Sequence, residues 1–490
     1  MAYKTTIGLE IHAELKTATK MFCACKNDPD EARPNWNICP VCTAQPGTLP
    51  VINAKAVEHV LRVGAALGST LADFTEWDRK NYFYPDIPKG YQISQYKYPL
   101  VSGGSLRGVE ITRVHLEEDT GSSRHDKGDY SLVDYNRAGV PLMELVTEPV
   151  IHDAETAMAF AKELQLLLRY LGASDANMEK GEMRVEANIS ISETDTFGTK
   201  VEVKNLNSFK SVGDAIAFEI KRHEEVLARG EQVVQETRGW DENTGKTFSQ
   251  RKKETAHDYR YFPEPDLPKL KISEIPKFQN LKATLPELPW ERRAYLSKEF
   301  GFQDAVVEMY VSDREFGAFF DAIVAESKGD KELIKLSSNY ISSDLASLRK
   351  NIGVTAHGRK SDVHPGYAEA IKHGMAGPAM LKPSNFISLM RMVQSGDLSS
   401  RGAKDTLAIM FKEGGEPKDI AEKNGLIQKS DAGALEAVAK EIIAANATVA
   451  EEYKAGKTAL LQFFVGQGMK ATKGSANPKM LGDIFSKLLS

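Results

Sequence analysis

Residues Thr6–Leu15 read TIGLEIHAEL, a stretch in which apolar and polar side chains alternate. Its apolar positions are Ile7, Leu9, Ile11, Ala13 and Leu15, and the polar positions between the later ones are Glu10, His12 and Glu14. Alternation with a period of two is typical of a β-strand that buries one face. Met183–Ile191 (MRVEANISI) alternates in the same way, and Val201–Lys204 (VEVK) continues the pattern. The first part of the chain is therefore predicted to contain a sheet.

Two helices are predicted between these strands and after them. One runs from Asp153, a helix N-cap, to Gly172, a helix stop, and the other runs from about Val212 to Gly230. Aspartate accepts the free N–H groups of a first helical turn, and glycine adopts the left-handed conformation that ends a helix. Strands and helices together predict an α+β fold built on a mainly antiparallel sheet.

Proline-rich stretches end this region. Phe262–Pro268 (FPEPDLP) and Leu285–Pro289 (LPELP) are interpreted as a linker. Beyond them, Trp290–Phe300 and Ala432–Asn446 have helical patterns and strand patterns fade. We predict an α+β domain over 1–290 and two helical domains over 291–400 and 401–490, with their boundary near Ser400.

The bulk composition sets limits on function. The chain has 490 residues, a formal net charge of -5, 41% hydrophobic residues and 27% charged residues, which is the profile of a soluble protein of two or three domains. The acidic balance weighs against a broad nucleic-acid-binding face, although a local basic patch is compatible with it. Neither a membrane span nor a signal peptide is apparent, so we expect a cytoplasmic protein.

All four cysteines lie close together, as Cys23-x-Cys25 and Cys39-x-x-Cys42. Two close pairs across a short loop indicate a tetrahedral zinc site, whose four thiolates would close it and make it structural. Four free core cysteines or two disulfides are the alternative, and the first pair is tighter than the usual spacing. If all four thiols bind zinc, none remains to attack glutamine, so this chain is not a cysteine glutaminase.

Acidic residues also occur where apolar ones are expected. Glu144 in PLMELV would share a strand face with Leu142 and Val146, and Glu118 would share one with Val114 and Leu116. A carboxylate in an apolar layer is costly unless it is paired or binds a cation. Glu10 and His12 project together from the first strand, and carboxylates are what Mg²⁺ prefers. Each acid taken alone is as well explained by an ion pair or by partial exposure.

Other motifs are less informative. Gly239–Thr247 (GWDENTGKT) resembles a phosphate loop but has the wrong spacing, so we predict a hairpin turn and no standard ATP loop. Aromatic and basic residues mix at Arg79–Tyr84 (RKNYFY) and Tyr259–Phe262 (YRYF). Such mixtures can stack on nucleic-acid bases, but a polar-capped hydrophobic core is favoured.

Longer motifs resemble one family along essentially the whole chain: GLEIH (8–12), DRKNYFYPD (78–86), KGYQISQ (89–95), HLEEDTG (115–121), VEVKNLNSF (201–209), DYRYFPEPD (258–266) and FFVGQGMKATKGSANP (463–478). They are similar to the B subunit of the Asp/Glu-tRNA amidotransferase, in its bacterial three-subunit type. An archaeal paralogue carries an additional inserted domain, for which this chain is too short.

The resemblance implies a cradle-shaped catalytic domain, a helical domain and a tail domain that holds tRNA. It implies as partners an amidase A subunit, which releases ammonia from glutamine, and a small C subunit. It also implies the reaction: ATP phosphorylates the side chain of Glu or Asp on a mischarged tRNA, and channelled ammonia displaces the phosphate to give Gln-tRNA or Asn-tRNA.

Site residues follow from matching positions. Glu10, His12, Glu118 and Glu144 correspond to the family's Mg²⁺ site, and Cys23, Cys25, Cys39 and Cys42 correspond to the zinc cluster of members that have one. Arg184, Glu186, Asn188 and Lys204 line polar strand faces, where we expect some of them to contact ATP or the activated ester. Two alternatives remain, a tRNA-binding scaffold subunit without chemistry and a zinc-dependent hydrolase, which a closed four-cysteine site disfavours.

Overall fold

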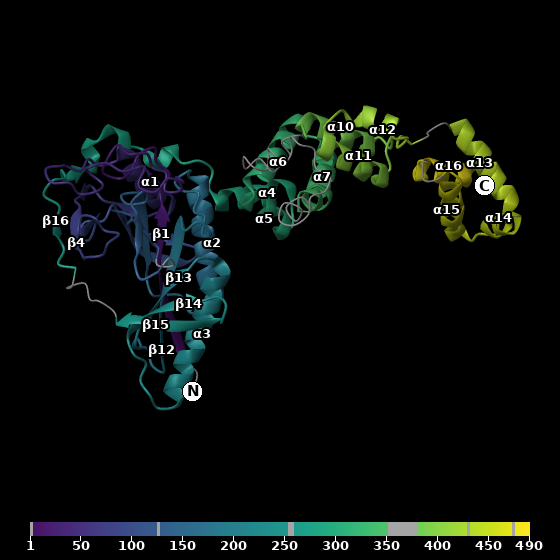
Figure 1. Cartoon of the computed structure of the whole chain (residues 1–490). Coiled ribbons are helices and arrows are strands. Elements are labelled where there is room, and N and C mark those ends of the chain that lie inside the picture. The colour runs from purple at the N-terminus through teal and green to yellow at the C-terminus, as the bar shows by residue number, and fades with distance from the viewer. Residues whose placement is uncertain (1–2, 125–127, 253–258, 351–380, 429–431, 473–475) are drawn as a thin grey trace. The chain divides into compact units, whose positions relative to one another are not determined.

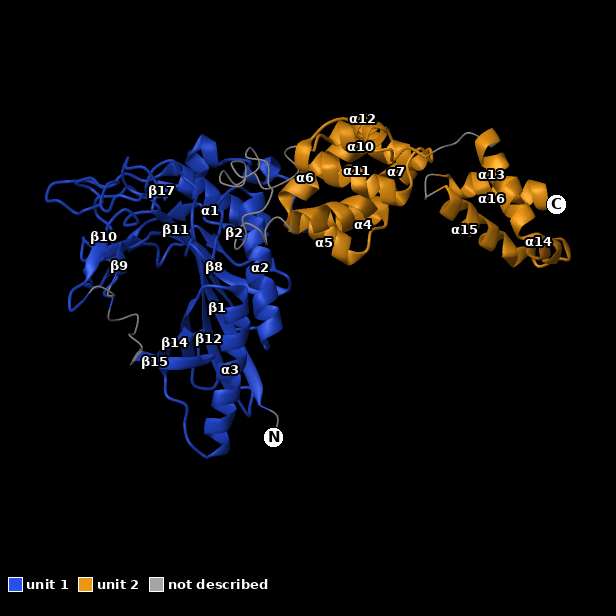
Figure 2. Ribbon diagram, turned by 45° about the vertical axis from the view of Figure 1, so that its right-hand side comes forward, with its two compact units in different colours: residues 1–291 blue, residues 292–490 orange. Residues whose placement is uncertain are grey.

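The computed structural model describes residues 3–124, 128–252, 259–350, 381–428, 432–472 and 476–490. The chain divides into two compact units, Met1–Glu291 and Arg292–Ser490 (Figure 2). The first holds the strands and the second is helical (Figure 1). The predicted α+β class, with a mainly antiparallel sheet followed by helices, is confirmed.

A ten-stranded sheet forms the frame of the first unit. Its main path runs β15-β14-β13-β12-β1-β11-β8-β6-β2, and β7 pairs with β8 off this path. Neighbours are antiparallel except β13 and β14, which are parallel. The strands are β1 (Lys4–Glu14), β2 (Thr70–Leu71), β6 (Val101–Ser102), β7 (Ser105–Leu106), β8 (Val109–Glu118), β11 (Pro141–Thr147), β12 (Met183–Ser192), β13 (Val201–Leu206), β14 (Glu236–Asp241) and β15 (Lys246–Lys252).

Three helices pack against this sheet. α1 (Ala54–Ala66) contacts β8, α2 (Ala154–Tyr170) contacts β1, and α3 (Phe209–Ala228) contacts β12. The apolar residues of β1, including Ile7, Leu9 and Ile11, are fully buried in the resulting core. The opposite face of β1 carries its polar residues, and this is where the candidate site lies.

The helix ends follow capping chemistry. The Asp153 side chain accepts a hydrogen bond from the Thr156 N–H at the start of α2, as predicted. The start of α3 was predicted too late, because Ser208 caps it by accepting from the Ser211 N–H. The segment that resembles a phosphate loop is the β14–β15 hairpin, as predicted, and Gly245 adopts a φ of 62° in its turn.

Small sheets complete the first unit, and they correct the linker interpretation. β4 (Asp78–Asn81) pairs with both β5 (Tyr91–Ser94) and β16 (Phe262–Pro263). Arg79 donates hydrogen bonds of 2.6 and 2.8 Å to the buried carboxylate of Glu264. The stretch 262–268 is thus part of the first unit, where the bidentate ion pair between Arg79 and Glu264 holds it. The remaining short strands are β3 (Phe74–Thr75) with β17 (Leu270–Lys271), and β9 (Ser122–Arg124) with β10 (Leu132–Asp134).

The described residues of the second unit form helices. They are α4 (Pro289–Phe300), which begins in the first unit, α5 (Asp304–Ser312), α6 (Arg314–Glu326), α7 (Lys331–Tyr340), α10 (Pro383–Gln394), α11 (Ser400–Glu413), α12 (Pro417–Lys423), α13 (Ala432–Ala445), α14 (Ala447–Lys454), α15 (Leu461–Ala471) and α16 (Pro478–Leu489). The last four share their own hydrophobic cluster, which includes Leu435, Phe464 and Phe485. Within the described ranges, no helix combines the length and apolarity needed to cross a membrane.

Candidate functional site

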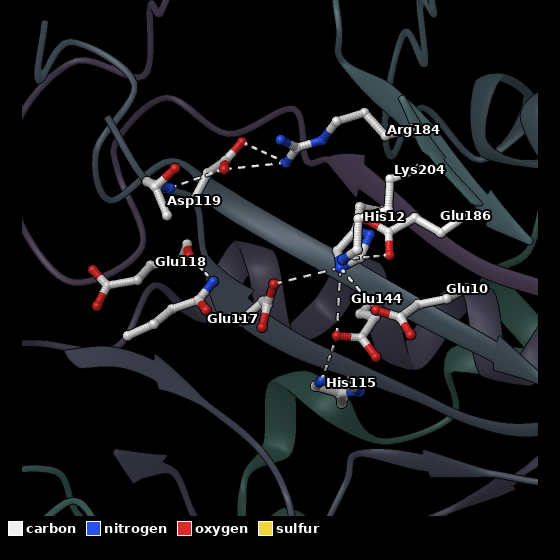
Figure 3. Close-up of polar contacts among 12 residues, drawn as sticks. Glu10, His12, His115, Glu117, Glu118, Asp119, Glu144, Arg184, Glu186 and Lys204 are labelled. Atoms are coloured by element: carbon white, nitrogen blue, oxygen red, sulfur yellow. Dashed lines mark hydrogen bonds and ion pairs between the residues drawn. The ribbon is translucent and has the colours of Figure 1, made fainter. Parts of the chain in front are cut away.

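His12 stands among three carboxylates on the polar face of the large sheet (Figure 3). Its Nε2 atom lies 3.5 Å from an oxygen of Glu144, 3.7 Å from one of Glu117 and 3.8 Å from one of Glu10. On the far side of Glu144, the Nε2 atom of His115 lies 3.4 Å from the same Glu144 oxygen. Two imidazoles and three carboxylates therefore occupy one small volume.

Strand register brings these residues together. His12 on β1 is opposite Glu144 on β11, and Glu144 is opposite His115 on β8. Directly opposed residues of antiparallel strands project from the same face of the sheet. Glu10 and Glu117 lie two residues from His12 and His115, so they project from that face as well.

Negative charge is in excess in this cluster. Burial raises the pKa of the Glu10 carboxyl to about 7, and the charges of Glu144 and Glu186 act in the same direction. Burial alone would lower the pKa of His12, but the hydrogen bond with Glu144 and the nearby carboxylates raise it to about 9. The Oε2 atom of Glu117 is buried and has no hydrogen-bond partner within the described part of the chain. A donor set of this kind, with an unsatisfied buried carboxylate oxygen, fits a divalent cation.

Glu10, His12 and Glu117 of this cluster line a pocket with a volume of about 190 Å³, and basic side chains line it as well. Lys204 lies 2.8 Å from Glu186, and Arg184 lies 3.0 Å from Asp119. Lys80 faces the pocket too: burial would lower its pKa, but the charge of Glu117 and its neighbours holds that pKa well above the usual value. Basic side chains beside an acidic cluster that could hold a divalent cation suit a ligand that carries several negative charges, such as a polyphosphate.

A second candidate metal site lies in the loop after β1. The sulfur atoms of Cys23, Cys25, Cys39 and Cys42 all lie within 4.8 Å of one another. None of them forms a disulfide. A hydrogen bond from Cys23 lowers the pKa of Cys42 to about 5, although burial acts against this. Four converging thiol groups fit a closed tetrahedral metal site.

Comparison with known proteins gives the family. The model of the GatB/GatE catalytic domain matches residues 5–276, and the model of the GatB domain matches residues 318–489. The B subunit of the aspartyl/glutamyl-tRNA(Asn/Gln) amidotransferase of Picosynechococcus sp. is 41% identical, over 99% of this chain and 98% of its own length. The B subunits of the same enzyme from Persephonella marina and Chlorobium chlorochromatii are each 41% identical over the full length of both chains.

The chain belongs to the family of amidotransferase B subunits. The resemblance inferred from the sequence motifs is thereby confirmed.

Most of the site residues predicted for this amidotransferase chain lie together. Glu10, His12, Arg184, Glu186 and Lys204 line the acidic pocket, and Glu144 adjoins it through His12. Two residues lie elsewhere. Asn188 is opposite Gly8, further along β1, and does not line the pocket. Glu118 projects from the other face of β8, where it accepts hydrogen bonds from the Lys89 ammonium at 2.5 Å and from the Ile93 N–H at 3.0 Å.

Glu117 occupies the place in the cluster that was predicted for Glu118. Glu117 was not among the predicted site residues, and neither were His115, Lys80 and Asp119. The motif HLEED places two glutamates side by side, and only the pairing of β8 with β11 decides which of them faces His12. Lys80 is held at the pocket by the short sheet of β4, β5 and β16, which the linker interpretation had not anticipated.

Proposed function

We propose that this chain is the ATP-using subunit of a tRNA-dependent amidotransferase, and that it converts Glu-tRNA(Gln), Asp-tRNA(Asn) or both into the amidated forms. The observation that carries this proposal is the cluster of His12 with three carboxylates at a pocket lined by three cationic side chains. Family membership supports the same reaction, because the relatives are described as aspartyl/glutamyl-tRNA amidotransferase subunits.

The chemistry requires activation before amidation, because a free carboxylate resists attack by an amine. The γ-phosphoryl group of ATP is transferred to an oxygen of the Glu or Asp side chain, which gives ADP and an acyl phosphate. The nitrogen of ammonia then bonds to the carbonyl carbon and the bond from that carbon to the phosphate oxygen breaks. Phosphate leaves with the proton that the nitrogen loses.

The residues of the pocket and of the adjoining cluster have different roles in this reaction. Glu10, His12, Glu117 and Glu144 would hold Mg²⁺, which offsets the charge of phosphate oxygens when bound. Lys80, Arg184 and Lys204 orient the phosphates or the activated ester through charge-assisted hydrogen bonds. Glu118 pairs with Lys89 outside the pocket and so acts as a positioning residue.

The rest of the assembly follows the family. An amidase A subunit would supply ammonia from glutamine and a small C subunit would bridge the two larger chains. The four cysteines would hold a structural zinc ion. The helical tail, residues 401–490, would bind the tRNA.

The test measures ADP formation by the chain co-expressed with its partner subunits. ADP should form only when ATP, Mg²⁺ and a mischarged Glu-tRNA or Asp-tRNA are all present. Correctly charged Gln-tRNA is the matched control, because its amide has no carboxylate to phosphorylate. Amide formation without any ADP would contradict the proposal. So would ADP formation at equal rates with Gln-tRNA.

A further inference from the structure

Large aromatic side chains are exposed to solvent beside the acidic pocket. Phe83 is 86% exposed, Tyr84 47% and Phe262 43%. Together with Arg260 they line a hollow of about 800 Å³. The hollow lies where the loop after β4 meets the segment entering β16, two strands that lie side by side in Figure 1. A cluster of exposed aromatic rings of this kind marks a binding surface more often than an accident of packing.

The hollow adjoins the acidic pocket. Tyr82, Tyr84 and Tyr259 line both of them. A ligand with its reactive group in the acidic pocket would therefore extend over the aromatic surface.

The surface is already formed in the free chain. Asn81 donates from its backbone N–H to the Tyr259 carbonyl at 2.9 Å and from its side-chain amide to the Arg260 carbonyl at 2.9 Å. Tyr82 makes edge contacts with Tyr84 and Tyr259, with ring centroids 5.8 and 5.7 Å apart. The Arg260 side chain is exposed and pairs with no carboxylate in the described ranges. Ordering Tyr84 on binding would cost little conformational entropy, since its ring is already held against Tyr82.

We propose that Phe83, Tyr84, Phe262 and Arg260 form a stacking surface for the terminal adenosine of the aminoacyl-tRNA. This inference rests on the proposed function. The aminoacyl ester is carried on the ribose of that nucleoside, so a side-chain carboxylate in the acidic pocket brings the adenine to the adjoining hollow. Arg260 would contact the phosphates that precede it.

Recognition in this hollow favours an RNA end over the adenine of ATP. Selective binding of ATP requires hydrogen bonds to the edge of its base, from a few well-placed polar groups. Here the side-chain amide of Asn81 already donates to the carbonyls of Tyr259 and Arg260. The hollow thus offers rings and one guanidinium, the combination by which proteins hold single-stranded nucleic acid by stacking.

The test compares uncharged tRNA with and without its terminal adenosine, as ligands of the complex of the chain with its partner subunits. Wild type should bind the complete tRNA about tenfold more tightly than the shortened one. A difference of this size agrees with the binding free energy that one stacked base contributes. Phe83→Ala should reduce this ratio to about twofold, whereas Phe83→Trp should keep it. Phe197→Ala is the matched control, because Phe197 is 72% exposed and does not line the hollow.

Three results would overturn the stacking surface. The first is that Phe83→Ala leaves the ratio of affinities for complete and shortened tRNA unchanged. The second is a rise in the KM for ATP alone, which would assign the hollow to the adenine of ATP. The third is loss of a partner subunit from the Phe83→Ala complex on gel filtration, which would assign it to a protein interface. If the wild-type complex shows the tenfold ratio of affinities but forms no amide, the proposed function is wrong, whereas the stacking surface is still supported.

Discussion

Glu117 and Glu118 are neighbours in the chain but project from opposite faces of β8. Glu117 joins His12 and Glu144, whereas Glu118 is paired with Lys89. The sequence indicated that acidic residues in apolar surroundings matter at Glu10, Glu118 and Glu144, and it placed Glu10 and His12 on one side of their strand. It could not select between the two glutamates of HLEED, because a shift of one residue in strand register exchanges the faces.

The two glutamates therefore predict different responses to Mg²⁺. Glu117→Gln removes a negative charge from the cluster, so the Mg²⁺ concentration for half-maximal amidation should rise at least tenfold. Glu118→Gln should leave that concentration within about threefold of wild type, because it acts through Lys89. Mg²⁺ titrations of the amidation rate for both variants measure this. Equal shifts in the two variants would show that the acidic cluster around His12 is not the Mg²⁺ site.

At the scale of elements, contacts between distant segments determine structure that local sequence patterns do not indicate. Alternation identified β1 and β12 almost to the residue, because half-buried strands have a strict period. The stretch 262–268 was misread because its prolines resemble a linker, although Phe262 and Pro263 form an edge strand and Glu264 is buried against Arg79. Such tertiary ion pairs leave no local trace in the sequence.

The cysteine loop gives a prediction about metal removal. The Cys42 sulfur lies 4.0 Å from the fully buried Lys20 ammonium, so the loop is anchored in the core near β1. Zinc content measured by mass spectrometry should fall in Cys42→Ser. The thermal midpoint should fall by about 5 °C or more, since loss of a structural metal removes folding free energy. Chelation should reproduce this shift in wild type and cause no further change in the variant. A wild-type protein that contains no zinc would contradict the assignment.

The contact between α3 and the β14–β15 hairpin predicts a dependence on pH. Burial would raise the pKa of Glu219, but the His223 imidazole 3.2 Å away and hydrogen bonds from Arg222 and Thr247 lower it to about 2. A carboxyl whose pKa is depressed on folding stabilises the fold above its ordinary pKa, and this contribution is lost as the pH falls toward 2. Glu219→Gln should therefore lower stability by about 3 kcal/mol at pH 7, as expected for a broken buried ion pair.

Thermal unfolding of both proteins between pH 7 and pH 2.5 measures this effect. The difference between wild type and Glu219→Gln should be constant above about pH 5 and should narrow as the pH falls below 4.5. Glu225→Gln, an exposed change on the same helix, is the control. A difference that does not vary with pH would show that Glu219 stabilises the fold by packing alone.

At the scale of the whole molecule, the boundary between the two units lies where the sequence pattern changes from strands to helices. The predicted domain boundary near Ser400 falls just before α11, which packs against α10. It stays a prediction, as do the separate roles of the helical and tail domains. Hydrophobic patterns show where helices are but not which helices share a core, because any amphipathic helix can pack against another. Residues 351–380, inside the predicted helical domain, lie outside the described part of the chain.

We expect amide formation to depend on phosphoryl transfer at the cluster around His12. The most direct measurement is ATP-dependent amidation of mischarged Glu-tRNA and Asp-tRNA by the co-expressed complex, with ammonium supplied in place of glutamine. Glu144→Gln is compared with wild type and with Glu155→Gln, an exposed change of the same kind at the start of α2. Folding of each variant is checked by thermal unfolding. Wild type and Glu155→Gln should form the amide, and Glu144→Gln should lose at least a hundredfold in rate. Equal rates in all three proteins would show that Glu144 is only a structural carboxylate and would contradict phosphoryl transfer at this site.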